Sequence, residues 1–257
     1  MVVPRLVTVE PIRIQAPNPG VMTIDGTNTW VIPGPAGTVV IDPGPDEQSH
    51  LAAIRAQRPI VAVALTHRHA DHSAAVESLA PDAPVFAASA RFAAGVDPVS
   101  EGQLFHRGGG DGGDGVVLRV LHTPGHTEDS VCFAYEEAPN GPILFTGDTL
   151  LGGRYAGYVS RVGGDLGSFL ESLERLAALA GYRGFPGHGP LIPDVASHAR
   201  RALDYRRSRL ATLAKYLAAG GGPDPDVVAL DRYPDHPERR APAAWMVQVE
   251  LDYLAAR

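Results

Sequence analysis

The chain has 257 residues, of which 44% are hydrophobic and 20% charged, and its formal net charge is −7. This composition is that of an ordinary globular protein long enough to bury a core, and the acidic balance does not favour a nucleic-acid-binding domain, which is usually basic. The single cysteine, Cys132, excludes both an intrachain disulfide and a cysteine-based metal cluster.

Strand-like and helix-like patterns alternate along the first 190 residues. A short apolar run at 39–41 ends in a turn-forming Asp-Pro-Gly, and residues 60–65 are apolar over the whole length of a strand. Residues 116–121 and 143–146 predict two later strands, and the apolar spacing over 168–180 predicts a helix. The alternation predicts an α/β architecture in which sheets are covered by helices.

The remainder of the chain has a different character. Residues 194–219 predict a long helix ended by three glycines and a proline, and residues 241–256 predict another helix after a proline-rich stretch. We therefore expect two units, a catalytic domain over 1–190 and a small, mainly helical domain over 191–257.

The position of the cysteine and the beginning of the chain carry two smaller expectations. Cys132 lies within a predicted strand at 130–135, so we expect a buried structural thiol and not a nucleophile. The first residues lack the basic-then-apolar pattern of a secretory signal, and no apolar run approaches the roughly 20 residues that span a bilayer. We expect a cytoplasmic protein that is not inserted in a membrane.

The strongest local signal is the run Thr66-His67-Arg68-His69-Ala70-Asp71-His72, which directly follows the buried strand at 60–65. It holds four ligand-type side chains within six residues, and a tight turn can bring them together. Imidazole and carboxylate suit zinc and related divalent metals. Histidines also cluster by chance on exposed loops, so the run by itself leaves that alternative open.

Three further segments repeat the same arrangement downstream. They are His122-Thr123-Pro124-Gly125-His126, Thr146-Gly147-Asp148-Thr149 and Pro186-Gly187-His188-Gly189, and each follows a strand-like stretch and contains a glycine at a turn. Each segment would place one side chain at the end of a strand, where functional loops carried by a rigid sheet are commonly found.

These motifs resemble the metallo-β-lactamase superfamily, whose signature is H-x-H-x-D-H followed by a separate His, Asp and His. All seven positions match, in order, within residues 42–188. The resemblance implies an αββα sandwich, two sheets flanked by helices, with a metal pair at one edge.

Residue by residue, the resemblance implies two metal sites. His67, His69 and His126 would hold the first metal, Asp71, His72 and His188 the second, and Asp148 would bridge them. The cofactors would be two divalent ions, zinc in the first place, with manganese or iron as alternatives. A water bridging the ions would supply hydroxide at neutral pH, and Asp71 would orient it as the catalytic residue.

Other residues are expected to support this centre or to bind the substrate. Asp42 matches the superfamily's first motif and would orient ligands from outside, although a plain turn aspartate is the alternative. His122 would be a second outer residue. Substrate contacts are predicted for Asn28, Trp30, Arg154 and Arg161, with anchoring of the sheet edge as the alternative for Trp30.

The substrate is less determined than the metal centre. A bridging aspartate aligns the chain with the glyoxalase II and ribonuclease branches, and the whole chain is most similar to the β-lactamase-like protein 2 family, in which a winged-helix-like segment follows the catalytic domain. This favours hydrolysis of single-stranded RNA, with thioester hydrolysis of a small or carrier-bound acyl group as the alternative and a non-catalytic metal-binding module as a third. A basic path for RNA could come from Arg154, Arg161 and a helical group, unless that group is only a solvated helix face. This helical group of arginines consists of Arg200, Arg201, Arg206, Arg207 and Arg209.

Overall fold

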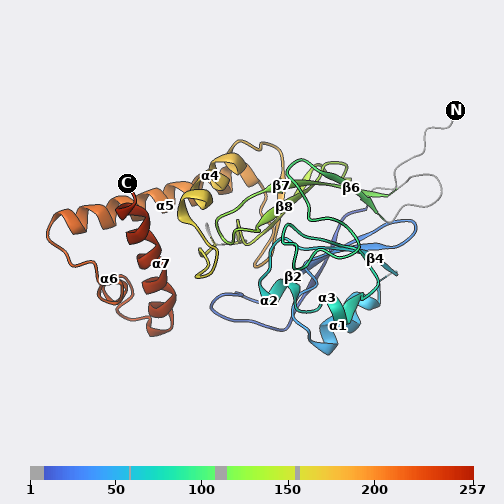
Figure 1. Cartoon of the computed structure of the whole chain (residues 1–257), viewed down its shortest axis with the longest axis horizontal. Helices are drawn as coiled ribbons and strands as arrows, with labels where there is room; N and C mark the ends of the chain where they lie inside the picture. Colours follow the sequence, from blue (N-terminus) through green and yellow to red (C-terminus); the bar gives the residue numbers. More distant parts are fainter. Residues whose placement is uncertain (1–8, 58, 108–114, 154–156) are drawn as a thin grey trace.

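The computed structural model describes residues 9–57, 59–107, 115–153 and 157–257 (Figure 1). Two five-stranded sheets pack face to face. The first has the order β1-β2-β3-β4-β5, and the second has the order β10-β9-β8-β7-β6. The strands of the first sheet are β1 (Ile12–Gln15), β2 (Asn28–Pro33), β3 (Thr38–Ile41), β4 (Ile60–Ala64) and β5 (Val85–Phe86). Those of the second are β6 (Leu104–Arg107), β7 (Val116–His122), β8 (Val131–Tyr135), β9 (Ile143–Gly147) and β10 (Arg183–Pro186).

Both sheets are mixed, with an antiparallel part and a parallel edge. In the first sheet β1, β2 and β3 pair antiparallel, whereas β3, β4 and β5 pair parallel. In the second sheet β6 to β9 pair antiparallel, and β10 adds parallel to β9. Because β3 and β4 run parallel, and β9 and β10 do as well, the loops that follow each pair leave from the same edge of their sheet.

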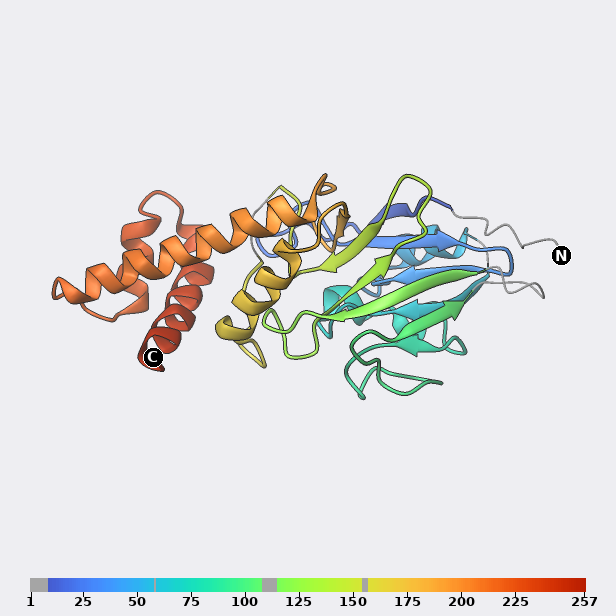
Figure 2. The same ribbon diagram turned by 90° about the horizontal axis from the view of Figure 1, so that it is seen from above.

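The order of the layers follows from which side chains each strand sends to each face. Along β2, Trp30 and Ile32 enter the core between the sheets, while Val31 faces the opposite side. Helices α1 (Gln48–Arg55), α2 (Ala70–Ser73) and α3 (Val76–Leu79) lie on the outer side of the first sheet, and α4 (Leu166–Ala177) packs on the second (Figures 1 and 2). The expected αββα sandwich is confirmed.

The C-terminal part consists of α5 (Val195–Ala218), α6 (Pro225–Arg232) and α7 (Pro237–Ala255). Figure 2 shows α5 running out from the sandwich, with α6 and α7 gathered at its far end. The expected helical character is confirmed. Residues 191–257, all of which the structure describes, contain no strand, so the segment has helices but not the strands of a wing.

Most predicted elements are present, with differences at the helix ends. Helix α4 begins two residues before the expected start, because the Asp165 side chain accepts a hydrogen bond from Ser168 N at 2.7 Å and caps it. Helix α6 was not predicted; Asp224 caps it and Pro225 occupies its first position, so the proline that suggested a loop begins a helix. Among the described residues, no helix is both long enough and apolar enough to cross a membrane.

Candidate metal centre

Four loops bring the seven ligand candidates together at one edge of the sandwich. They follow β4, β7, β9 and β10, which end at Ala64, His122, Gly147 and Pro186. Within the described residues, three groups of side chains hold ligand atoms within 4.8 Å of one another, and all seven candidates belong to them. The sequence placed these residues at strand ends, and the fold makes the strand ends meet.

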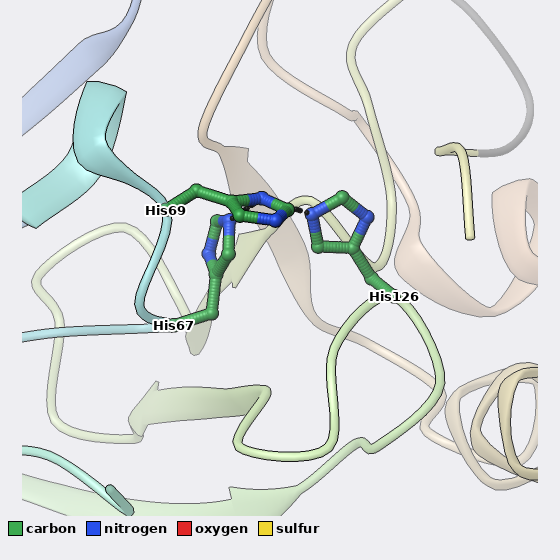
Figure 3. A group of neighbouring side chains, drawn as sticks. All are labelled: His67, His69 and His126. Atoms are coloured by element: carbon green, nitrogen blue, oxygen red, sulfur yellow. Dashed lines mark hydrogen bonds between the residues drawn. The ribbon is translucent and has the colours of Figure 1, made fainter. Parts of the chain in front are cut away.

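The first group is formed by His67, His69 and His126, whose imidazoles point toward one another in Figure 3. His69 Nδ1 lies 3.1 Å from His67 Nε2 and 3.0 Å from His126 Nε2. His67 and His126 are buried, whereas His69 is partly exposed. Three ring nitrogens therefore converge on one small volume that is open on one side.

The second group is formed by Asp71, His72 and His188. His188 Nε2 lies 3.2 Å from His72 Nε2 and 3.2 Å from Asp71 Oδ2, and His72 Nε2 lies 3.5 Å from the same carboxylate oxygen. Both histidines are fully buried, whereas Asp71 is partly exposed.

Asp148 lies between the two groups and faces both. Its Oδ2 is 3.7 Å from His126 Nε2, and its Oδ1 is 3.4 Å from His72 Nε2 and 3.5 Å from His188 Nε2. Oδ1 is buried and has no hydrogen-bond partner. Burying a carboxylate oxygen without a partner lowers the stability of the fold, so a cation bound beside Oδ1 would be stabilising.

Outer hydrogen bonds set which ring nitrogen of each histidine carries the proton. His126 Nδ1 donates to the Tyr158 carbonyl, and His188 Nδ1 donates to the Gly26 carbonyl at 3.1 Å. A carbonyl can only accept, so Nδ1 of both rings carries a proton, and Nε2 is the nitrogen that faces inward and becomes the ligand atom in the neutral ring. Fixing the tautomer through the second ring nitrogen is the usual arrangement around a metal-binding histidine.

Asp42 does the same for the two remaining buried rings. Its Oδ2 is 2.9 Å from His72 Nδ1 and accepts from Thr66 Oγ1 at 2.7 Å, and its Oδ1 accepts from Thr66 N at 2.8 Å. Because Thr66 Oγ1 gives its proton to Asp42, it accepts from His67 Nδ1, which lies 3.1 Å away. His67 and His72 therefore also present Nε2 to the groups.

The electrostatic environment differs between the groups. Burial, together with the neighbouring His72 and His126, holds the pKa of His67 well below its usual value. Burial lowers the pKa of His69 to about 4 and also lowers that of His126. The first group is thus neutral near pH 7 and ready to donate lone pairs.

In the second group, carboxylates outweigh burial. Burial disfavours the charged form of His72, but Asp148, Asp71 and Asp42 raise its pKa well above the usual value. Asp148 also raises the pKa of His188 against the effect of burial. Burial would raise the pKa of Asp148, yet His188 and His72 hold it well below its usual value. In the second group, protonated histidines and ionised carboxylates therefore stabilise one another.

The side chains present fit a divalent metal site. Imidazole nitrogens that face inward, together with two carboxylates of which one has a buried oxygen without a hydrogen-bond partner, are what nitrogen- and oxygen-binding metals require. The outer partners that fix the rings are also in place.

The predicted outer and substrate residues are placed differently. His122 bonds to Val99, Glu101 and Arg175, and to none of the seven candidates. Asn28 and Trp30 are buried, and both donate to the Pro186 carbonyl, so they support the turn that carries His188; for Trp30 this placement agrees with the anchoring alternative. Arg154 lies outside the described residues.

A cavity of about 480 Å³ opens beside the groups. Arg161, for which a substrate contact was predicted, lines it, and so do His69, Asp71, His126 and Asp148. The remaining walls could not be predicted from the sequence, because they come from four separate segments that no local pattern connects. These walls are Met22, Leu151, Tyr158, Val159, Ser160, Ala241, Pro242 and Trp245.

The arginines of α5 do not form a path to the groups. Arg206 is 5% exposed and donates to the Gly157 carbonyl. Arg207 pairs with Glu174, and Arg209 Nε lies 3.5 Å from the buried Glu250. Arg200 donates to the Ala177 carbonyl at 2.9 Å. Their bonds within the chain show that this helical group is structural in large part.

The cysteine is confirmed as a buried side chain. Cys132 is 0% exposed within β8, and burial raises the pKa of its thiol to about 12. A thiol with that pKa is not a nucleophile at neutral pH.

Comparison with known proteins identifies relatives over most of the chain. The family model of the metallo-beta-lactamase superfamily matches residues 22–188. The lactamase-like protein adaB of Aspergillus niger is 34% identical, over 85% of this chain and 71% of its own length. An atrochrysone carboxyl ACP thioesterase of Passalora fulva is 32% identical, over 81% of this chain and 63% of its own length.

Solved structures show the same fold. The metallo-beta-lactamase family protein TTHA1429 of Thermus thermophilus has a TM-score of 0.76 at 22% identity and covers 96% of this chain and 93% of its own. TTHA1623, solved in a di-iron-bound form, has a TM-score of 0.56 at 30% identity and covers 76% of this chain and 98% of its own.

Proposed function

This chain belongs to the metallo-beta-lactamase superfamily and is a hydrolase, and we propose that it hydrolyses acyl thioesters at the seven-residue centre. The observation that carries the proposal is the cavity beside the two groups. Leu151, Val159, Pro242 and Trp245 give it apolar walls, and the only Lys or Arg among its described lining residues is Arg161. Such a cavity suits the apolar body of an acyl group.

The same observations weigh against RNA, which the sequence pattern favoured. RNA needs a cationic track for its backbone and flat side chains on which bases stack. The α5 arginines bond within the chain, and the cavity offers one arginine, Arg161, and two aromatic side chains, Tyr158 and Trp245, which do not make a cationic track. Relatives named as thioesterases, in Passalora fulva and in Aspergillus fumigatus, support the thioester alternative.

We propose two divalent ions, with zinc as the native metal. His67, His69 and His126 would hold one, Asp71, His72 and His188 the other, and Asp148 would face both. Bound ions would polarise the thioester carbonyl and lower the pKa of a water molecule. The solved di-iron form of TTHA1623 supports a pair of metals and leaves iron as an alternative.

The chain's own side chains divide the remaining work. Asp71 lines the cavity and is the most exposed carboxylate of the centre, so we assign it the orientation of the attacking water. Burial would raise its pKa, but His72 and His188 outweigh that effect and keep the pKa low. The carboxylate is therefore ionised and can accept a hydrogen bond from water near pH 7.

Two finer assignments accompany this function. We propose that residues 1–190 form the catalytic domain and 191–257 a helical addition, which is supported by the family match ending at 188 and α5 beginning at 195. The two parts share one hydrophobic cluster, so the addition is docked on the sandwich. We also propose proximity to the β-lactamase-like protein 2 branch, on the strength of the sequence resemblance.

The test is a parallel assay of zinc-loaded protein on a panel of acyl thioesters and on single-stranded RNA. We expect thioester cleavage that is lost on chelation and strongly reduced by Asp71→Asn. Asp82→Asn, an exposed aspartate outside the centre, is the matched control. Cleavage of RNA without thioester cleavage would overturn the proposed substrate.

A further inference from the structure

The segment 157–160 links the first group of histidines to the C-terminal helices. On one side, the Tyr158 carbonyl accepts from His126 Nδ1, and Ser160 N donates to the His126 carbonyl at 2.8 Å. Ser160 Oγ also lies 3.2 Å from His69 Nε2. Two of the three imidazoles in the first group are thus oriented by one short segment.

The other side of this segment is held by α7. Trp245 Nε1 donates to the Val159 carbonyl at 2.6 Å, and the Met246 sulfur accepts from Val159 N at 3.4 Å. Val159 is 1% exposed, and its buried N–H and carbonyl groups have the Met246 sulfur and the Trp245 indole as their partners. The indole is itself covered by Arg161, whose guanidinium lies 5.0 Å from the ring centroid.

Helix α5 adds a second anchor at the start of the segment. The buried Arg206 donates to the Gly157 carbonyl. Gly157 passes close to the centre, since a Cβ placed on it would lie 2.1 Å from the Asp148 carbonyl oxygen. The segment therefore has little freedom to move without displacing residues of the centre.

A second tryptophan, Trp30, holds the loop behind the second group in a similar way. Trp30 Nε1 donates to the Pro186 carbonyl at 3.1 Å, and Asn28 Nδ2 donates to the Pro186 and Gly189 carbonyls at 3.1 and 2.8 Å. These bonds hold the turn that carries His188. Each of the two indoles thus anchors the loop behind one group.

We propose that Trp245 is a positioning residue for the first metal group, through which the C-terminal helices set the orientation of His69 and His126. Its indole N–H holds Val159, and the flanking residues then hold the two imidazoles. The C-terminal helices are in this way part of the metal centre and not only a wall of the cavity. The inference rests on the proposed metal groups and is independent of the proposed thioester substrate.

The experiment measures zinc affinity by chelator competition in two backgrounds that each keep one group. His188→Ala leaves the first group intact, and His126→Ala leaves the second. Into each background we place Trp245→Phe or Trp30→Phe, because phenylalanine keeps an aromatic ring but lacks the N–H donor. This pair makes the same chemical change at the two anchors, so each variant is the other's control.

We expect Trp245→Phe to weaken zinc binding about tenfold in the His188→Ala background and less than about twofold in the His126→Ala background. Tenfold is the lower end of the effect of residues that orient metal ligands, because Trp245 acts through an intervening segment. Trp30→Phe should give the reverse pattern. A purely structural role would weaken both backgrounds alike, and equal losses, or no loss, would overturn the inference.

A second variant covers the case in which Trp245→Phe does not fold. Arg206→Met removes the bond to Gly157 while keeping a long apolar side chain, and it should weaken zinc binding in the same background as Trp245→Phe; an unchanged affinity would contradict the proposal. Failure of the unsubstituted chain to bind zinc would overturn the metal groups and this inference together. Zinc binding without thioesterase activity would overturn only the proposed substrate.

Discussion

Replacing Asp42 with asparagine tests whether one buried carboxylate sets the orientation of His72. Asp42 is 2% exposed and accepts from Thr66 N, Thr66 Oγ1 and His72 Nδ1. Its backbone has φ of 50°, a conformation that asparagine tolerates well. The substitution keeps the oxygen that faces Thr66 N and replaces the other with an NH₂ group. The NH₂ group is a hydrogen-bond donor, and it would face Thr66 Oγ1 and His72 Nδ1, which both donate to the carboxylate oxygen that it replaces.

The size of the effect follows from these bonds. Two hydrogen bonds to a charged acceptor are lost, each contributing about 1.5–3 kcal/mol, so we expect the free energy of unfolding of the metal-free chain to fall by about 3 kcal/mol. We take the lower end of this range because Thr66 Oγ1 and a neutral His72 Nδ1 can also accept, so the new NH₂ can donate to one of them. If His72 Nδ1 becomes the acceptor, the proton moves to Nε2, where zinc would bind. Zinc affinity should then fall 10–100-fold, about 1.4–2.7 kcal/mol.

Urea unfolding of the metal-free chain, followed by circular dichroism, measures the first quantity, and chelator competition measures the second. Asp46→Asn is the matched control: Asp46 is exposed and accepts from Ser78 Oγ at 2.9 Å, so we expect a change within about 0.5 kcal/mol and unchanged zinc affinity. Unchanged zinc affinity in Asp42→Asn, or an equal loss in both variants, would refute the argument that Asp42 fixes the tautomer of His72.

Three further predictions follow from burial and charge. Cys132, with a pKa of about 12, should resist iodoacetamide at pH 8 in the folded chain and react once urea unfolds it; rapid alkylation of the native chain would contradict its burial. Phe169→Ala should lower the free energy of unfolding by about 3–5 kcal/mol, because the side chain is fully buried between α4 and the second sheet, whereas the half-exposed Val227→Ala should change it by less than about 1 kcal/mol. Carboxylates raise the pKa values of His72 and His188 in the metal-free chain, so near pH 7 these rings hold more protons than free imidazoles would, and zinc must displace them. Zinc affinity should therefore rise with pH through neutrality and fall on acidification, and calorimetric titration at pH 7 in buffers of different ionisation enthalpy should show proton release; a binding heat independent of the buffer would contradict this.

Helix ends show how far local patterns extend. The apolar spacing placed α4 and α5 correctly, but the start of α4 is set by Asp165, and α6 lies in a stretch that proline content marked as irregular. In both cases a capping aspartate decides the boundary, and its effect depends on one backbone hydrogen bond. Periodicity reports which face is buried and is insensitive to such bonds.

The seven ligand candidates could be named from the sequence because their motifs match the superfamily signature, and each of them follows a strand by a few residues. Strands such as β4 and β9 are recognisable as short apolar runs, and the residues after them are fixed to the sheet edge by the chain itself. The type of side chain then indicates the chemistry. Asp42 could be named for the same reason, since it directly follows β3.

What surrounds the centre was decided only by tertiary structure. Asn28 was expected to contact the substrate, and Trp30 either to contact it or to anchor the sheet edge. Both donate to the Pro186 carbonyl, 158 and 156 residues away. Trp245 and Val159 are 86 residues apart, and no periodicity marks them as partners. The sequence by itself determined the ligand types and their places at strand ends, because these depend on neighbours along the chain. The cavity walls and the anchors of the ligand loops depend on how α7 docks on the sandwich, and that packing is set by side chains far apart in the sequence.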